Sequence, residues 1–165
     1  MERSVRRTSE VDIPSVLRIY DNARARMRLE GNDGQWLTQP NERTLRRDMG
    51  LDSSYVITEG GEVVGTFYLS ANPDPAYAEI EGKWMTDGPY YVIHRIAGDG
   101  IHRGILKTAV SYALNFTSDI RIDTHEKNVS MQSALRSLGF VRCGTVYIKD
   151  ERSDRSPRIG FELVK

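Results

Sequence analysis

The chain has 165 residues, a length that fits one domain, and its 23 lysines and arginines balance 23 aspartates and glutamates to a formal net charge of zero. Zero net charge removes the usual argument for nucleic acid or an anionic membrane surface as a partner, and the single cysteine, Cys143, excludes an internal disulfide. Because the apolar stretches are shorter than the roughly 20 residues of a membrane helix and the charged N-terminus does not resemble a signal peptide, we expect one cytoplasmic domain over residues 1–165.

The N-terminal third is predicted to be helical. A short strand-like stretch precedes Asp12, which we expect to cap a helix that has Pro14 in its first turn. Apolar residues at helical spacing carry this helix to a stop at Gly31: Ile13, Val16, Leu17, Tyr20, Ala23 and Met27. A second, shorter helix is predicted over residues 41–50.

The middle of the chain favours strands. Residues 54–70 are typical of a hairpin, because two β-rich runs flank a Gly60-Gly61 turn. Residues 71–89 contain Pro73, Pro75 and Pro89, so we expect an irregular segment there, called the excursion below. Residues 90–97 are typical of a strand that is buried on both faces.

The last third alternates strands and helices. A glycine-rich turn leads into a helix over residues 105–113, and a strand is predicted over residues 119–126. The next helix spans residues 131–138 and stops at Gly139, and residues 143–165 are typical of a final hairpin with a charged loop. This order of elements predicts a domain of the α+β class.

The two strand–helix units of this region carry specific motifs. "HRIA" is followed by the glycine turn (residues 98–104), "HRGILK" opens a helix, and "NVSMQSALRSLGF" follows the next strand. In this order the motifs resemble the GNAT superfamily of acetyl-CoA-dependent N-acetyltransferases. In that family an asparagine ends the fifth strand and "LGF" leads into the sixth, an arrangement matched by Asn128 and by Leu138, Gly139 and Phe140.

A narrower resemblance links "GQW", "DP.Y..IEGKW", "YVIHRIA" and "RIDTHEKN..M" to a set of bacterial GNAT proteins. The superfamily resemblance implies the GNAT fold, a mostly antiparallel twisted sheet of six to seven strands with about four helices and a V-shaped gap between strands 4 and 5. It also implies transfer of an acetyl group from acetyl-CoA to a primary amine of a small molecule or peptide. The acceptor stays open at this point.

The glycine turn suits the pyrophosphate of coenzyme A on physical grounds. Pyrophosphate needs backbone N–H donors at the start of a helix, and Gly104 keeps a side chain away from them. The turn lacks the "GKS/T" ending of a Walker-type nucleotide site. The resemblance adds main-chain contacts to pantetheine at the end of the "HRIA" strand. The predicted cofactor residues are Ile96, Ala97, Gly98, His102, Arg103, Gly104, Ile105, Leu106, Lys107, Thr108, Asn128 and Met131.

Two departures from the family pattern affect these expectations. Leu106 stands where the family commonly has glycine or alanine, so its side chain either crowds the pyrophosphate or faces the core. Leu135 stands where the family often has a tyrosine that protonates the leaving thiolate. Both favour an alternative function, a catalytically weak GNAT-like acyl-CoA-binding or regulatory module.

The catalytic candidates lie around "RIDTHEKN". Asp123 and His125 are predicted to assist removal of a proton from the amine, because a histidine titrates near neutral pH. The alternative interpretation pairs Asp123 with Arg121 or Arg95 and gives His125 a hydrogen bond in the loop or a helix-capping role. Tyr147, or else Cys143, is the candidate acid. We expect no metal, because Asp123 and His125 have no third ligand at a suitable spacing.

The acceptor pocket is predicted from aromatic and polar residues in irregular segments: Gln35, Trp36, Tyr77 and Trp84, with His94 on the neighbouring strand. In the alternative interpretation the two tryptophans only anchor long loops to the core, and His94 is an interior histidine with satisfied hydrogen bonds. We expect no nucleic-acid or membrane partner. An exposed sheet edge is compatible with a homodimer.

Overall fold

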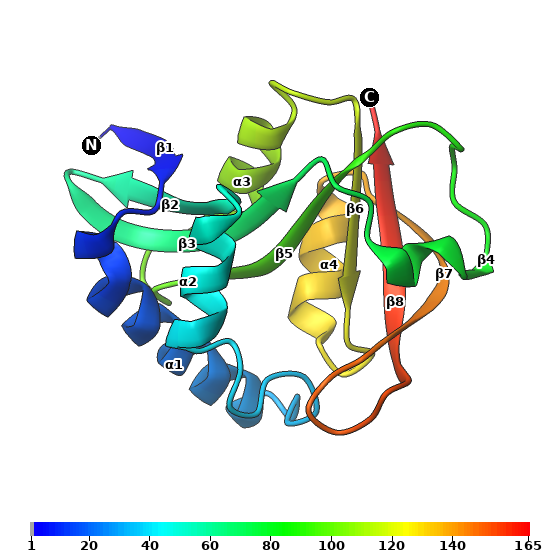
Figure 1. The fold of residues 1–165 in the computed structure, drawn as a ribbon, viewed down its shortest axis with the longest axis horizontal. Helices are drawn as coiled ribbons and strands as arrows, with labels where there is room; N and C mark the ends of the chain where they lie inside the picture. The colour runs from blue at the N-terminus through cyan, green and yellow to red at the C-terminus, as the bar shows by residue number, and fades with distance from the viewer. Residues whose placement is uncertain (1) are drawn as a thin grey trace.

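A computed structural model describes residues 2–165 and contains one eight-stranded sheet and four α-helices (Figure 1). The strands are β1 (Arg3–Arg7), β2 (Ser54–Glu59), β3 (Glu62–Ser70), β4 (Glu81–Gly82), β5 (Tyr91–Gly98), β6 (Asp119–Thr124), β7 (Val141–Ile148) and β8 (Ser156–Val164). The α-helices are α1 (Ile13–Leu29), α2 (Glu42–Gly50), α3 (Ile105–Ala113) and α4 (Val129–Ser137), with short 3₁₀ turns η1 (Glu10–Asp12) and η2 (Pro75–Ala78).

The sheet has the order β1-β2-β3-β5-β6-β8-β7-β4, and every neighbouring pair except β5–β6 is antiparallel. The predicted α+β class and mostly antiparallel sheet are confirmed, with one strand more than expected. The additional strand is β4, inside the excursion that was predicted to be irregular. It pairs with β7 where two glycines, Gly82 and Gly144, face each other, and a Cβ on either one would lie within 2.3 Å of a backbone oxygen.

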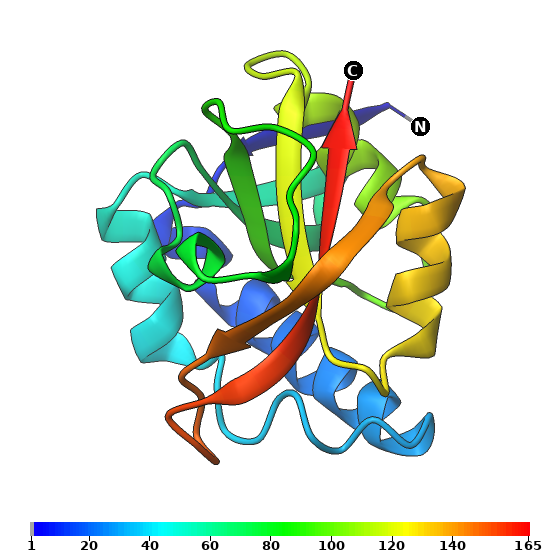
Figure 2. The ribbon, with the colours of Figure 1, turned by 90° about the vertical axis from the view of Figure 1, so that its right-hand side faces the viewer.

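The helices cover both faces of the sheet, with α1 and α2 on one side and α3 and α4 on the other (Figure 2). Adjacent residues of β2 show the division, because Val56 belongs to the core cluster that includes residues of α1 and α2, and Ile57 belongs to the cluster that includes residues of α3 and α4. Burial of apolar side chains on both faces of a central strand is the arrangement expected for a sheet between two helical layers. Among residues 2–165, none of the helices is long and apolar enough to cross a membrane.

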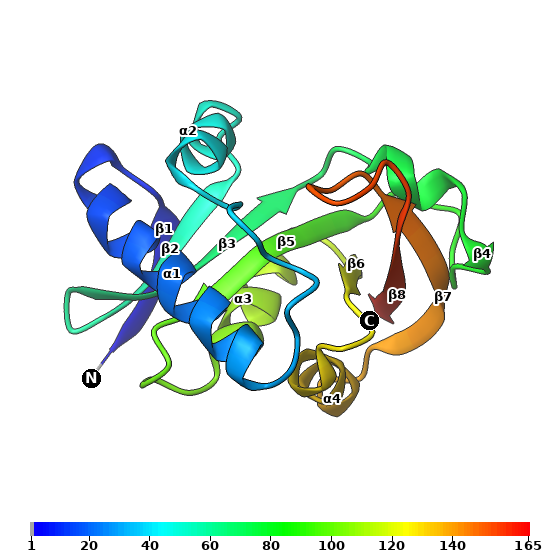
Figure 3. The ribbon, with the colours of Figure 1, turned by 90° about the horizontal axis from the view of Figure 1, so that it is seen from below.

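Strands β5 and β6 diverge after a short ladder (Figure 3). Their parallel ladder contains two residue pairs, Tyr91–Ile120 and Val92–Arg121. Further along β5, Arg95 has a φ of +50°, and the β3–β5 register shifts between Thr66 and Tyr68. The bulge turns the strand away from β6. The expected V-shaped gap is therefore present between β5 and β6, the fourth and fifth strands when two-residue β4 is left out.

The helices stop where glycine predicted, but α4 begins at Val129, two residues before its predicted start. Gly31 and Gly139 follow α1 and α4 with φ values of +83° and +95°. Asp12 stands at the predicted N-cap position of α1, but its side chain accepts no amide from that helix; its carboxylate accepts the backbone N–H of Ser9 at 2.8 Å and two bonds from Arg6. Asp12 is also the last residue of η1, whose own N-cap is Ser9.

Candidate active site

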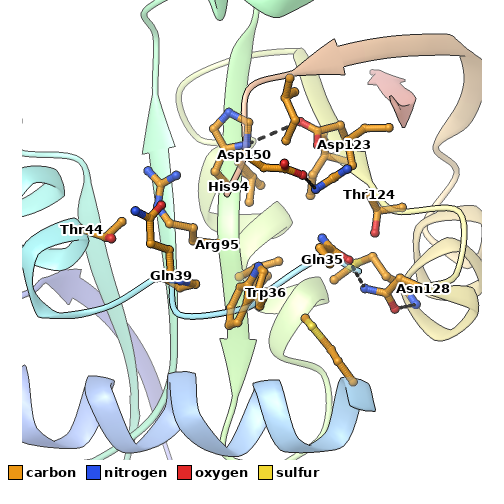
Figure 4. A pocket seen from close by; sticks show the side chains of 18 of the residues that line it. Gln35, Trp36, Gln39, Thr44, His94, Arg95, Asp123, Thr124, Asn128 and Asp150 are labelled. Atoms are coloured by element: carbon orange, nitrogen blue, oxygen red, sulfur yellow. Dashed lines mark hydrogen bonds and ion pairs between the residues drawn. The ribbon is translucent and has the colours of Figure 1, made fainter. Parts of the chain in front are cut away.

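A cavity of about 300 Å³ opens where β5 and β6 separate (Figure 4). Its walls come from the α1–α2 loop, α2, β5, the end of β6, the start of α4 and the β7–β8 loop. Seven of the predicted site residues line it: Gln35, Trp36, His94, Ile96, Asp123, Asn128 and Met131. The sequence analysis missed several others: Met27, Thr44, Arg95, Thr124, Asp150 and Arg158.

The predicted cofactor strand forms one wall of this cavity. Ile96 lines it, and Ala97 and Gly98 pair with Thr66 and Gly65 of β3 on the other side of the strand. Among residues 2–165 the ladder of β5 with β6 ends at Val92, so the edge of β5 that faces the gap continues without a ladder partner from β6. Such an edge can hydrogen bond to an extended ligand.

The glycine turn places the N-terminus of α3 beside the end of β5, where a Cβ on Gly98 would lie 2.8 Å from Ile105 Cγ1; within residues 2–165 the lining of the cavity includes no residue of α3. Gly104 caps the helix with a φ of +76°, a left-handed conformation that favours glycine. The first N–H groups of an α-helix have no partner within the helix, and no side chain caps them in the part of the chain that the structure describes. Leu106 packs against the main core cluster, so its side chain faces the core, one of the two expected outcomes.

A basic side chain from the far end of the sequence reaches this turn. Arg3 on β1 donates from Nη1 to the Arg103 carbonyl at 2.8 Å and to Thr108 Oγ1 at 3.1 Å, and it pairs with Glu59. The Gly104 Cα also faces this guanidinium, since a Cβ there would lie 3.5 Å from Nη1. Sequence spacing could not predict this contact, because it joins residues about a hundred positions apart.

Asp99 gives the turn a negative charge. Its Oδ1 accepts the backbone N–H groups of Ile101 and His102, both at 2.9 Å, and its Oδ2 contacts His102 Nδ1 at 2.7 Å. Burial opposes this charge, but the donated hydrogen bonds outweigh burial and lower the pKa of Asp99. The amides of Ile101 and His102 are therefore occupied, whereas those at the start of α3 have no side-chain cap among the described residues.

An amide network joins the α1–α2 loop to α4. Asn128 Oδ1 accepts the Met131 N–H at 3.2 Å and caps α4, while its Nδ2 donates to Gln35 Oε1 at 3.2 Å. Asn32 donates to the same oxygen at 3.0 Å. Because Oε1 is the acceptor of both bonds, the Nε2 amide of Gln35 is the group left to donate into the cavity.

His94 and Asp123 face each other across the gap. His94 Nδ1 lies 3.7 Å from Asp123 Oδ2 (Figure 4). His94 Nε2 lies 2.9 Å from Oδ2 of Asp74 in the excursion. The buried Tyr77 hydroxyl donates to Asp123 Oδ2 at 2.5 Å. The charge pairs considered for Asp123 do not form, because Arg121 pairs with Glu162 and Arg95 pairs with Asp48.

Other predicted catalytic residues lie elsewhere. His125 follows the end of β6, one residue beyond the strand, and its Nδ1 accepts the Lys127 N–H at 3.1 Å. Burial lowers its pKa, and it is absent from the lining of the cavity among the described residues. This geometry matches the loop-bonding interpretation of His125.

The candidate acids are likewise outside the cavity. Tyr147 packs under Arg155, whose guanidinium lies 3.8 Å from the ring centroid, and it lines a separate shallow hollow with residues of η2. Cys143 bonds to the Val141 carbonyl, and burial raises the pKa of its thiol. Leu135 is fully buried in the core. Thr124 adds a hydroxyl that was not predicted: the residue lines the cavity, and its Oγ1 is buried without a partner among residues 2–165.

The two tryptophans have different roles. Trp84 donates from Nε1 to the Tyr77 carbonyl at 2.8 Å and packs beneath Arg121, so it anchors the excursion. Tyr77 is buried behind Asp123 rather than exposed to a ligand. Trp36 lines the cavity and also packs edge-on against Tyr20. Within residues 2–165, no group of three or more metal-ligating side chains is arranged to hold a metal ion.

Solved structures share the fold of this chain. No family model matches the chain, and no curated protein sequence matches it significantly. A GNAT-family acetyltransferase from Streptococcus agalactiae is 28% identical, with a TM-score of 0.87 over 99% of this chain and 95% of that chain. A GNAT-family acetyltransferase from Listeria monocytogenes is 19% identical, with a TM-score of 0.70 over 100% and 96% of the two chains.

A third structure, YncA from Salmonella typhimurium with its cofactor acetyl-CoA, is 13% identical, with a TM-score of 0.61 over 98% and 93% of the two chains. At this identity the likeness concerns the fold alone. Three observations lead to one conclusion: the short β5–β6 ladder, the helix that starts after the glycine turn, and the likeness to the streptococcal acetyltransferase over nearly the whole chain. By its fold, the chain belongs to the GNAT superfamily.

Proposed function

We propose that the protein transfers an acetyl group from acetyl-CoA to a primary amine of a small molecule or peptide. The observation that supports this most directly is the cavity at the open seam between β5 and β6, which combines a free strand edge with acid–base side chains. Amide formation from a thioester needs such a site, because it must position an amine, remove its proton and stabilise charge on the thioester oxygen.

The chain supplies groups that fit acetyl-CoA. The N–H groups at the start of α3, with Lys107 and Arg3 nearby, suit a pyrophosphate. The edge of β5 at Ile96–Gly98 suits the amides of the pantetheine arm. Acetyl-CoA supplies an electrophilic thioester carbonyl, and Gln35 Nε2 and Thr124 Oγ1 are two donors at the cavity wall that suit its oxygen.

Titration calorimetry with acetyl-CoA tests the cofactor. Wild-type protein should bind it, and Lys107→Glu should weaken binding about tenfold or more, because the variant places a negative charge beside the pyrophosphate. Gly104→Glu should abolish binding, although the left-handed φ of Gly104 strains that variant. Lys83→Glu, an exposed lysine of the excursion, is the matched control.

Turnover separates this function from the alternative. Release of the CoA thiol in the presence of primary amines supports an acetyltransferase. Binding of acetyl-CoA without turnover of any amine would favour the acyl-CoA-binding module instead. Absence of binding by the folded wild-type protein would overturn both.

A further inference from the structure

We propose that His94 is the general base of this site, that Asp74 orients its ring and that Asp123 receives the ammonium group of the acceptor. The inference rests on the proposed acetyl transfer. It assigns removal of the acceptor's proton to a cluster of three residues, His94, Asp74 and Asp123, of which Asp74 lies in the excursion. Asp74 opens the "DP.Y..IEGKW" motif but was not among the predicted site residues, and it reaches His94 from the start of η2.

Asp74 fixes the protonation pattern of the imidazole. Its Oδ1 accepts the Ala76 N–H at 2.9 Å, and its Oδ2 lies 2.9 Å from His94 Nε2. Burial opposes the charge of Asp74, but the bonds from His94 and Ala76 outweigh it and lower the pKa of Asp74. An ionised carboxylate only accepts, so Nε2 carries the hydrogen and Nδ1 of the neutral ring carries the lone pair.

That lone pair faces a negative charge across the gap. The 3.7 Å between His94 Nδ1 and Asp123 Oδ2 is longer than a hydrogen bond, so neither atom is satisfied by the other. Burial, and then the Asp123 charge, raises the pKa of Tyr77 well above its usual value, so the phenol keeps its proton and donates to Asp123. An ammonium group between Asp123 and His94 would bond to both.

The proton then has a defined path. The ammonium R–NH₃⁺ gives one proton to His94 Nδ1, and the free amine R–NH₂ forms the new C–N bond. Its second proton leaves with the CoA thiol as the C–S bond breaks, and His94 returns its proton to water. The products are R–NH–CO–CH₃, CoA–SH and H⁺, which balances the reaction.

Two carboxylates border the ring that takes up this proton. Titratable and charged groups near His94 include Asp74, which caps η2, Asp123 from β6, Tyr77 from η2, Tyr68 from β3 and Arg95 from its own strand. Four charged residues of the β7–β8 region line the same cavity: Lys149, Asp150, Glu151 and Arg158. Arg95 forms a bidentate pair with buried Asp48, and Arg158 pairs with Asp150.

The tautomer of His94 provides a test that needs no acceptor. The chain has three histidines, so ¹⁵N spectra of the imidazoles can be assigned with one glutamine variant for each. We expect the neutral His94 ring to be the Nε2–H tautomer. Asp74→Asn should switch it to the Nδ1–H tautomer, because Ala76 N–H holds Asn Oδ1 and leaves the amide to donate to Nε2. Asp87→Asn, an exposed residue of the same excursion, should leave it unchanged.

Kinetics with benzylamine, 1,4-diaminobutane and glycinamide provide the second test. His94→Gln keeps an N–H for Asp74 but is no base, so kcat should fall about a hundredfold or more and the acid limb of the pH profile should disappear. Asp74→Asn should lower kcat by a similar factor, whereas Asp87→Asn should keep the wild-type kcat. In all three variants the Kd for acetyl-CoA should stay within about twofold of the wild-type value.

Each failure has a separate meaning. A wild-type His94 in the Nδ1–H form, an unchanged tautomer in Asp74→Asn, or full turnover by His94→Gln alongside an inactive His125→Gln would overturn the assignment while acetyl transfer stands. Failure of the wild-type protein to bind acetyl-CoA would overturn the proposed function itself. The tautomer decides the assignment even where none of the three amines is acetylated.

Discussion

The side-chain amide of Asn128 donates to Gln35 Oε1 at 3.2 Å, and this bond ties the α1–α2 loop to the N-terminus of α4 across the mouth of the cavity. The orientation of both amides follows from the Met131 N–H, which fixes Asn128 Oδ1 as an acceptor. One helix cap therefore determines which atom of Gln35 faces the cavity.

Gln35→Ala should lower the free energy of unfolding by about 1–2 kcal/mol, because Asn32 and Asn128 both lose the oxygen to which they donate. Gln35→Glu retains an acceptor for both and should lose less stability, while it removes the donor that faces the cavity and lowers turnover. Thermal unfolding and steady-state kinetics measure the two effects. Gln39→Ala is the control for stability, and equal melting temperatures for the Gln35→Ala and Gln39→Ala variants would contradict the bridge.

Asp99→Asn should tighten the binding of acetyl-CoA about three- to tenfold, because it removes a negative charge beside the pyrophosphate site and keeps an acceptor for Ile101 and His102. In calorimetric titrations this gain in affinity should become smaller as the salt concentration rises, because its origin is electrostatic. Glu62→Gln makes the same charge change at an exposed hairpin position and should have no effect. Unchanged or weaker binding by Asp99→Asn would show that the charge of Asp99 does not oppose the ligand.

Asp119→Asn should make the protein more stable at neutral pH and change little at pH 4. Burial, and then the neighbouring Glu162, raises the pKa of Asp119 to about 6. The folded state thus holds a proton that the unfolded chain releases near pH 4, so wild-type stability falls as the pH rises from about 4 to 6. Asparagine has no such proton, and the gain at pH 7.5 should be about 1–3 kcal/mol.

Urea unfolding at pH 4.5, 6 and 7.5 measures this difference. Asp154→Asn, whose side chain is 93% exposed, is the control. If the free energy of unfolding of Asp119→Asn differed from that of the wild type by the same amount at all three pH values, the raised pKa of Asp119 would be contradicted.

Local chemistry made part of the fold predictable from sequence. Gly139 ends α4 as predicted, because glycine adopts the left-handed conformation after a helix end. Asn128 was predicted only from the family resemblance, and the structure shows that its amide side chain caps α4. Asp12 was predicted as the cap of α1, but it is also the last residue of η1, and spacing cannot distinguish the two roles.

The site was less predictable, because its contacts join distant segments. His94 and Asp123 lie on strands of recognisable pattern, whereas Asp74 lies in the excursion, where no periodicity assigns a direction to its side chain. The proximity of Arg3 to the glycine turn depends on the order of strands in the sheet, which composition does not encode. His125 attracted attention as a histidine after a strand, yet β6 ends one residue too early to present it to the gap.

The two-pair ladder between β5 and β6 divides the sheet into two four-stranded halves, β1-β2-β3-β5 and β6-β8-β7-β4. The excursion ties them together from outside: it leaves β3, and its Met85 N–H and Thr86 carbonyl bond to Glu162 on β8 and Arg121 on β6. Backbone pairing thus contributes little at the seam, and bonds to side chains link the excursion to β6 and β8. A change in the excursion at Met85 or Thr86 would therefore alter the link between the two halves without touching the β5–β6 ladder.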